Sequence, residues 1–195
     1  MPLPPPQPLG YTRREAPTSV DVALVGVKCM RVMGVDCGSQ YTGFAIVEQE
    51  AAEELHCVAM GAIRLSTRDP LEVRLLRIFQ ELSELIDAHR PEVVAIEDVF
   101  HAANAKSALK LGHVRGVAML AAAQAGLPVV AYAPLSVKSA VVGYGRAEKS
   151  QVQMMVTRLL KLEAVPEPPD VADALAIAIC HLHTAATLAH HAARP

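Results

Sequence analysis

The sequence contains no tryptophan, and aromatic residues make up only 4% of its 195 residues. The volume of a hydrophobic core must therefore come from aliphatic side chains. Cysteine is also scarce: the four present, Cys29, Cys37, Cys57 and Cys180, form no CxxC pair and show no zinc-ligand spacing. This pattern excludes a zinc ribbon or a disulfide-stapled domain, and it is typical of reduced thiols in the cytoplasm.

A long hydrophobic run is missing as well. The apolar stretch from Val20 to Val27 is too short to span a membrane, and no basic segment precedes it as in a signal peptide. We therefore expect a cytoplasmic protein with no membrane partner.

The chain lacks a strong net charge, because its formal value is -2. That average hides an asymmetry, since the segment from His101 to Lys161 contains eight basic residues and a single acid, Glu148. The basic residues are Lys106, Lys110, Arg115, Lys138, Arg146, Lys149, Arg158 and Lys161. Positive charge in one segment of an acidic chain is compatible with a nucleic-acid face. It is equally compatible with a solvated surface whose charges pair with acids elsewhere in the chain.

The first thirty residues are expected to lie outside the fold. They are rich in proline up to about Val20 and have no hydrophobic periodicity, which is typical of a disordered or non-native extension. The remainder, residues 31–190, is long enough for one domain and shows no internal repeat.

The hydrophobic pattern of residues 31–190 alternates between strands and helices. Strands are predicted at Arg31–Asp36, Tyr41–Glu48, Leu55–Leu65, Val93–Asp98 and Pro128–Ala133. Helices are predicted from Pro70 to about His89, Asn104 to about Gln124, Pro134 to Val142, Glu148 to Leu162 and Asp170 to about Ala189. This order predicts an α/β domain with a mixed five-stranded sheet flanked by helices.

Four acids stand at the ends of these elements. Asp36 ends the first strand, Glu97 ends the fourth, and Asp170 and Asp173 begin the last helix, where a spacing of three places both on one face. Active sites of open α/β sheets gather at strand ends and helix starts. Asp170 taken alone is better explained as a helix cap or first-turn acid, whereas Glu97, after a run of buried residues, has no evident structural role.

If the first and fourth strands are neighbours, the four carboxylates form one cluster. Such a cluster cannot stay fully ionised without cations, and hard divalent ions, above all Mg²⁺, are the natural counter-charge for oxygen ligands. Two Mg²⁺ ions about 4 Å apart would suit phosphodiester hydrolysis.

Five motifs occur in order and resemble those of one enzyme family. They are Gly34-Val35-Asp36-Cys37-Gly38-Ser39 with Thr42-Gly43, Ala95-Ile96-Glu97-Asp98-Val99-Phe100, Asn104 to Gly112 with Arg115 to Ala118, Ala147 to Val152, and Asp170 to Ala178. From about Arg31 to His183 the chain resembles the RuvC family of Holliday-junction resolvases.

The resemblance implies a ribonuclease-H-like fold and a homodimer that cuts four-way DNA junctions by paired, symmetric, magnesium-dependent nicks. It maps the family's catalytic acids onto Asp36, Glu97, Asp170 and Asp173, and it implies work with the RuvA and RuvB branch-migration complex. The family's dimer interface includes the helix that begins here at Asn104, which would explain Gly112 and Gly116 in that helix.

The resemblance also suggests DNA-binding residues. Phe100 matches a phenylalanine that stacks on bases, and a core phenylalanine is the alternative. Lys138 and Lys149 match lysines near the scissile phosphate, and Lys106, Lys110 and Arg115 lie in the basic segment. Plain solvated lysines would look the same in the sequence. Cys37 departs from the family pattern, where proline is common, and would place a thiol near the metals.

Two other functions remain open at this stage. An ATPase or sugar kinase of the actin-like superfamily has a similar phosphate loop, but needs a second lobe and a second glycine-rich loop. A domain that binds junctions without cutting them is the third interpretation, and the intact acid set argues against it.

Overall fold

The computed structural model describes residues 29–50, 54–98 and 105–192. Most of the expected proline-rich extension, residues 1–28, therefore lies outside the described part. A single mixed sheet has the strand order β3-β2-β1-β4-β5. Its strands are β1 (Met30–Asp36), β2 (Tyr41–Gln49), β3 (Leu55–Arg64), β4 (Val93–Glu97) and β5 (Val129–Tyr132). The first three strands form an antiparallel meander, and β4 and β5 run parallel to β1.

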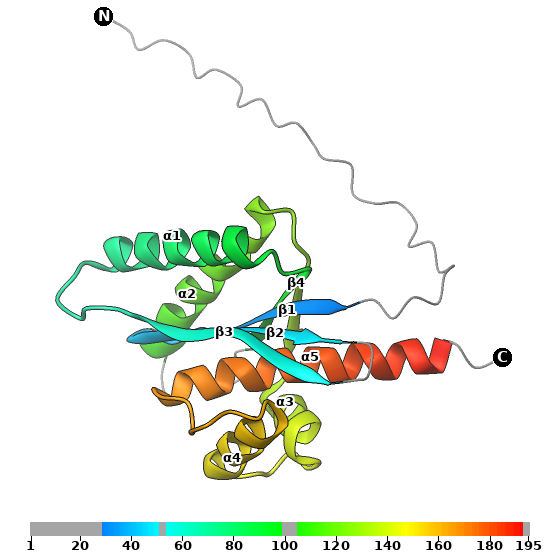
Figure 1. The fold of residues 1–195 in the computed structure, drawn as a ribbon. Helices are drawn as coiled ribbons and strands as arrows, with labels where there is room; N and C mark the ends of the chain where they lie inside the picture. The colour runs from blue at the N-terminus through cyan, green and yellow to red at the C-terminus, as the bar shows by residue number, and fades with distance from the viewer. Residues whose placement is uncertain (1–28, 51–53, 99–104, 193–195) are drawn as a thin grey trace, which may run out of the picture.

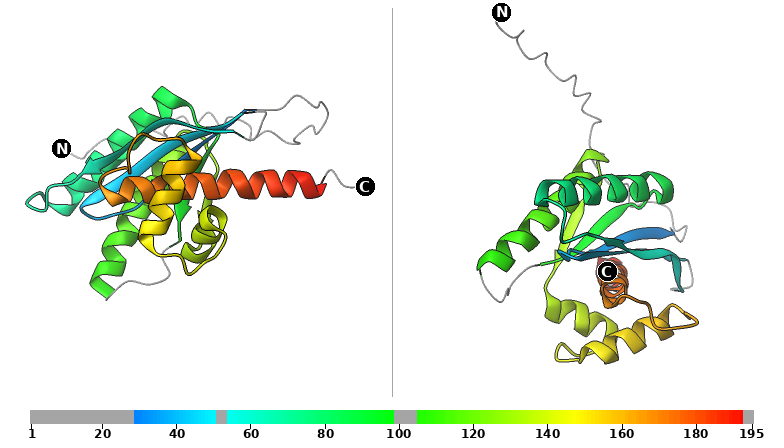
Figure 2. Two further views of the ribbon diagram at one scale, coloured as in Figure 1. Left: turned by 60° about the horizontal axis from the view of Figure 1, so that its bottom comes forward. Right: turned by 90° about the vertical axis from the view of Figure 1, so that its left-hand side faces the viewer.

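Helices cover both faces of this sheet (Figures 1 and 2). One face carries α1 (Leu71–His89) and α2 (Ala105–Gln124), and the other carries α5 (Pro169–Ala192) with α3 (Pro134–Val142) and α4 (Lys149–Leu159) beyond it. The strand β1 shows why two layers form, because its side chains alternate. Met33 and Val35 pack in the core under α1 and α2, whereas Val32 packs in the core under α5.

The helix α5 is the centre of its layer. Its residues from Ala174 to Leu182 are buried throughout, and it packs directly on β1 and β2. Gly34 makes this contact possible, because a Cβ at that position would lie 2.1 Å from the backbone oxygen of Ala174. Among the described residues α5 is the one helix long and apolar enough to cross a membrane, and its place in the core accounts for that composition.

The predicted five-stranded mixed sheet and its flanking helices are confirmed, and most boundaries agree within two residues. Two differences have local causes. The helix α4 ends at Leu159 rather than Leu162, because Leu160 leaves the helical region and Lys161 has a positive φ of 52°. Pro70 is the N-cap of α1 rather than its first helical residue, since the helix begins at Leu71.

The two glycines of α2 have no close neighbour within the described part of the chain. A Cβ on Gly112 or Gly116 would meet no atom within 4 Å in this chain. Leu109 and Leu120 lie three residues before and four residues after this pair, so all four share one helical stripe. Both leucines are exposed, at 63% and 58%. No element within the described part of the chain covers this stripe.

Candidate active site

Asp36 and Glu97 lie side by side at one edge of the sheet. They end β1 and β4, which pair in parallel with Val35 opposite Ile96. The next residue of each strand is the acid, so both carboxylates emerge at the carboxyl ends of neighbouring strands. The adjacency of these two strands, which the sequence left open, is what brings the first two acids together.

Asp170 reaches the same edge because two glycines leave room for it. Gly43 stands opposite Asp36 on β2, and a Cβ there would lie 2.0 Å from the backbone oxygen of Asp170. A Cβ on Gly38, in the turn after Asp36, would lie 3.2 Å from Oδ1 of Asp170. Thr42 is buried and donates its hydroxyl to the Gly38 carbonyl oxygen at 3.0 Å, which fixes this turn.

Asp173 follows one turn later on α5 and is paired with a lysine. The ammonium group of Lys149, the first residue of α4, donates to Oδ2 of Asp173 at 2.6 Å. Burial alone would lower the pKa of Lys149, but the hydrogen bond to Asp173 and the charges of Asp36 and Asp170 outweigh it, so that pKa is raised. The ammonium group of Lys149 thus already neutralises part of the negative charge of the four acids.

The acids affect one another's ionisation. Burial raises the pKa of Asp36 to about 7, and the negative charges of Asp173, Asp170 and Glu97 add to this effect. The pKa of Glu97 is also raised, first by burial and then by Asp173, against the opposing charges of Lys138 and Lys149. Because the charges of the other three carboxylates act on Asp36, the four acids form one electrostatic cluster.

We expect the metal-free protein to lose stability as the pH rises from 6.5 to 8. The native pKa of Asp36, about 7, lies above its ordinary value of 3.8, so the native state retains a proton that the unfolded chain has released. That contribution is lost as the pH passes the native value, by roughly 1 kcal/mol over this range. Thermal melts in EDTA measure it as a fall in Tm of about 2–4 °C.

The start of this pH range is chosen because of His181. Burial lowers the pKa of His181 below 6.5, so its neutral native form makes stability rise with pH mainly below this range. The part of that rise that falls above pH 6.5 is smaller than the loss from Asp36. A Tm that rises between pH 6.5 and 8 would contradict the clustered-acid electrostatics.

The acid cluster fits divalent metal ions by its donor chemistry. It offers only carboxylate oxygens, the ligands that Mg²⁺ and Mn²⁺ prefer, and its mutual repulsion calls for positive charge. The four carboxylates do not yet form a closed metal site. Within residues 29–50, 54–98 and 105–192, no group of three acids, histidines or cysteines lies close enough together to hold a metal ion. Lys149 instead neutralises Asp173 in this arrangement.

The basic residues named from the sequence have separate locations. Lys138 on α3 donates to the carbonyl oxygen of Ala147 at 2.9 Å and its charge acts on Glu97, so it lies beside the acid cluster, as does Lys149. Lys110 is exposed on α2, which covers the face of the sheet opposite to α3, α4 and α5. Arg115 also belongs to α2, where it lies 3.5 Å from Asp98.

Several basic residues of the segment from His101 to Lys161 pair with acids outside it. For these residues, the interpretation as a solvated surface with paired charges is supported. Arg115 pairs with Asp98, Lys149 with Asp173, and Lys161 with Glu54. Phe100 and the side chain of Lys106 lie outside the described residues, so their predicted DNA contacts stay predictions.

The thiol of Cys37 does not face the acid cluster. Cys37 is buried in the core under α1 and α2, on the face opposite Asp36. Burial, followed by the charge of Asp36, raises its pKa to about 12, so the reactive thiolate is scarce at neutral pH. Cys37 therefore lies next to Asp36 in the chain, but its thiol packs into the core on the other face of the sheet from the acids.

Two features of this edge were not found from the sequence. Tyr132, which ends β5 opposite Glu97, hydrogen-bonds to Nδ1 of buried His181 at 2.8 Å and ties β5 to α5. Three arginines, Arg64, Arg68 and Arg77, line a hollow at the end of β3, two strands away from Asp36. The spacing of Arg64 and Arg68 at the end of the third strand was a signal that could have indicated the hollow.

Comparison with known proteins identifies the family. The sequence model of the crossover junction endodeoxyribonuclease RuvC matches residues 32–181, which is more than half of the chain. The chain belongs to the RuvC family. Two relatives, both crossover junction endodeoxyribonucleases RuvC, come from Koribacter versatilis and Acidobacterium capsulatum. The first is 72% identical and the second 53%, and each comparison covers 82% of this chain and 96% of the relative.

Solved structures agree with this assignment. Thermus thermophilus RuvC in complex with a Holliday junction substrate is 34% identical, with a TM-score of 0.75 over 81% of this chain and 96% of that one. The yeast mitochondrial Holliday junction resolvase Ydc2 is only 14% identical, with a TM-score of 0.61, and it supports the fold alone. The ribonuclease-H-like fold is confirmed. Enzymes of the RuvC family are metal-dependent endonucleases and hydrolases, so an actin-like ATPase or sugar kinase is not favoured.

Proposed function

We propose that this protein is a structure-selective endonuclease that resolves four-way DNA junctions by paired symmetric nicks during homologous recombination and repair. The observation that carries the proposal is the clustering of Asp36, Glu97, Asp170 and Asp173 at one edge of the sheet, in a chain of the RuvC family. The solved Thermus thermophilus relative was captured with such a junction as its substrate.

The four acids would hold the metal ions of the reaction. We propose Mg²⁺, two ions in each site, with Mn²⁺ as a substitute, because the ligands are all carboxylate oxygens. Bound Mg²⁺ would supply an activated water and stabilise the leaving oxygen of the phosphodiester, which yields 5′-phosphate and 3′-hydroxyl ends. The chain's own contribution is a rigid edge: β1 and β4 fix two acids, and α5 fixes the other two.

Lys149 and Lys138 would act on the DNA beside these acids. The side chain of Lys149 is 57% exposed although it pairs with Asp173. Once a divalent cation neutralises Asp173, that ammonium group is free to bind a DNA phosphate. Lys138 holds Ala147, just before α4, and so positions the helix that presents Lys149.

The open stripe of α2 supports a homodimer. Leu109, Gly112, Gly116 and Leu120 present an apolar, closely approachable surface that nothing within the described residues covers. A second copy docked there would give two identical sites, which suits the approximate twofold symmetry of a four-way junction. We further propose that the enzyme acts in the cytoplasm on junctions handled by the RuvA and RuvB branch-migration complex.

The test is cleavage of a synthetic mobile four-way junction by the full chain in Mg²⁺, beside a linear duplex of the same sequence. We expect paired, symmetric nicks in two strands of like polarity in the junction alone, complete loss of nicking in EDTA, and recovery with Mn²⁺. End-labelling should find 5′-phosphate and 3′-hydroxyl termini.

Other outcomes would overturn parts of this proposal. Tight junction binding without cleavage in either metal would indicate a recognition protein. Equal cutting of linear duplex would contradict structure selectivity, and 3′-phosphate ends would contradict the proposed attack by a metal-activated water.

A further inference from the structure

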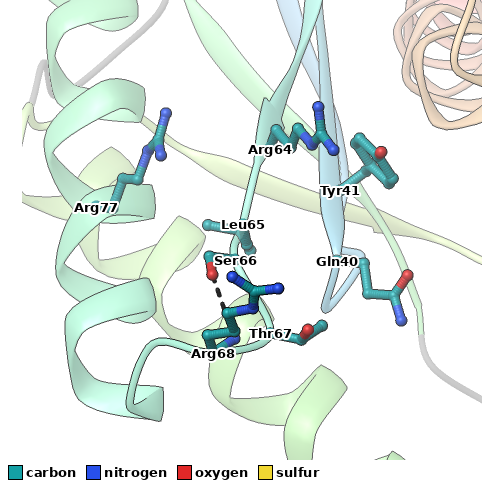
Figure 3. Close-up of a pocket in the computed structure, with 8 residues that line it drawn as sticks. All are labelled: Gln40, Tyr41, Arg64, Leu65, Ser66, Thr67, Arg68 and Arg77. Atoms are coloured by element: carbon teal, nitrogen blue, oxygen red, sulfur yellow. Dashed lines mark hydrogen bonds between the residues drawn. The ribbon is translucent and has the colours of Figure 1, made fainter.

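A hollow lined by arginines lies at the end of β3, beyond the acid cluster (Figure 3). Its volume is about 540 Å³. The side chains that matter to its chemistry come from the turn before β2 and the first residue of β2, from the end of β3 and the turn after it, and from α1. They are Gln40, Tyr41, Arg64, Ser66, Arg68 and Arg77.

The hollow begins on the same face of the sheet as Asp36. Arg64 stands opposite Tyr41 in the β2–β3 register, and Gly43, two residues along β2, stands opposite Asp36. Cross-strand partners share a face, and so do residues two apart along a strand. Since neighbouring strands lie about 5 Å apart, β3 is about 10 Å from the strand that carries Asp36.

The charges of the hollow are available to a ligand. Arg64 and Arg68 are exposed, and neither pairs with an acid within the described ranges, whereas Arg77 is hydrogen-bonded to Glu81 at 2.6 Å. Guanidinium groups suit phosphate better than ammonium groups do, because their fork of N–H donors matches two phosphate oxygens. The amide of Gln40 and the hydroxyl of Ser66 add neutral donors at the rim.

The shape favours a phosphate that belongs to a polymer. Sites for small molecules enclose their ligand and are lined mainly by apolar side chains. Here the lining is mainly polar, and Gln40, Arg64, Ser66 and Arg68 are all exposed to solvent. Duplex DNA presents a charge about every 3.4 Å along each strand. A backbone held at the acid cluster can therefore reach β3 within a few nucleotides.

We infer that this arginine pocket binds a backbone phosphate of the junction arm that leads away from the cleaved phosphodiester, with Arg64 and Arg68 as its principal ligands. This inference rests on the proposed junction-cleaving function. The pocket would fix the direction of the arm across the sheet, while the acid cluster performs the chemistry.

The test replaces Arg64 and Arg68 with glutamine together in the full chain and measures junction affinity by fluorescence anisotropy over a series of KCl concentrations. The logarithm of the association constant K falls linearly with the logarithm of the salt concentration, and each lost phosphate contact should make this slope shallower by about 1. That corresponds to roughly an eightfold loss of affinity at 0.1 M salt. The double variant should still nick the junction at saturating protein concentration, because the acids are unchanged.

Arg90→Gln is the matched control. Arg90 is exposed and ends α1 beside the start of β1, at the opposite end of the sheet from the pocket. We expect its affinity and salt slope to equal those of the unmodified protein. If the double variant folds poorly, Arg68→Gln alone, in the exposed turn, is measured instead.

Neutral methylphosphonates placed one at a time along an arm identify the bound phosphate. One position should weaken binding of the unmodified protein and have no further effect on the double variant. An unchanged salt slope and affinity in the double variant would overturn the inference, whatever small anions the pocket takes up. If the unmodified protein fails to cleave junctions, the proposed function fails instead, and the two failures are thereby distinguished.

Discussion

Asp36→Asn should abolish junction cleavage and at the same time stabilise the metal-free protein. Asp36 is the acid on which the other three carboxylates act, and it stands between β2 and β4, which makes it the central member of the cluster. Loss of a central metal ligand removes several kcal/mol of transition-state stabilisation. We therefore expect the nicking rate to fall about a thousandfold or more, with junction binding retained.

The gain in stability has the same origin as the loss of activity. Above pH 7 the unmodified protein carries a buried carboxylate whose pKa is raised to about 7, whereas asparagine carries no charge to desolvate or repel. We expect the free energy of unfolding at pH 8 in EDTA to increase by roughly 2–3 kcal/mol, or about 5–10 °C in Tm. The fall in stability between pH 6.5 and 8 should also be reduced.

Addition of Mg²⁺ should narrow the difference in stability between Asp36→Asn and the unmodified protein, since a cation that binds only the native state stabilises the unmodified protein. Asp87→Asn is the control, because Asp87 is an exposed acid on α1 and should change neither Tm nor cleavage. Should Asp36→Asn retain normal nicking, or lower Tm at pH 8 in EDTA, Asp36 would not be the centre of a repulsive, metal-binding cluster.

Gly43→Ala should be strongly destabilising and should also impair cleavage. The added methyl group would lie 2.0 Å from the backbone oxygen of Asp170 and 2.5 Å from its carbonyl carbon, and neither atom can move without shifting α5. Overpacking against backbone costs about 3 kcal/mol or more. Urea unfolding in EDTA measures this loss, and the shift of α5 should lower the cleavage rate even where the variant remains folded.

Gly61→Ala is the matched control for this substitution. Gly61 is also a strand glycine with little space, but its added methyl group would meet Cζ and Cε1 of Phe44 at 2.8 and 2.9 Å. The tip of a side chain can turn away, so we expect a loss of less than about 1.5 kcal/mol and normal cleavage. Equal losses in the two alanine variants would show that α5 does not depend on close approach at Gly43.

The positions of the strands and helices could be predicted from the sequence because local patterns determine them. Alternating apolar residues predicted β1 and β2, and the apolar face from Leu71 to Ile86 predicted α1. The positions of Asp36 and Glu97 at strand ends were equally local. Pairing of β1 with β4 was not, because the two strands lie about sixty residues apart and share no local signal.

The pairing of charges also depended on the tertiary structure. Lys149 was a candidate DNA ligand in the sequence, and its contact with Asp173 joins residues 24 positions apart. The resemblance placed the glycines of α2 in a dimer interface, and only the folded chain shows that no neighbour within the described residues covers them. The arginine pocket is formed by the end of β3, by α1 and by the start of β2 with the turn before it, so no single stretch of sequence contains it.

By itself the sequence determined the secondary structure, the acids available for chemistry and the resemblance that led to the family, because each depends on residues close together in the chain. Only the tertiary structure decided which acids meet, which charges are already paired, which face Cys37 occupies and where a basic hollow forms. Those properties depend on strand order and on how closely α5 approaches the sheet, and both are set by packing between segments far apart in the sequence.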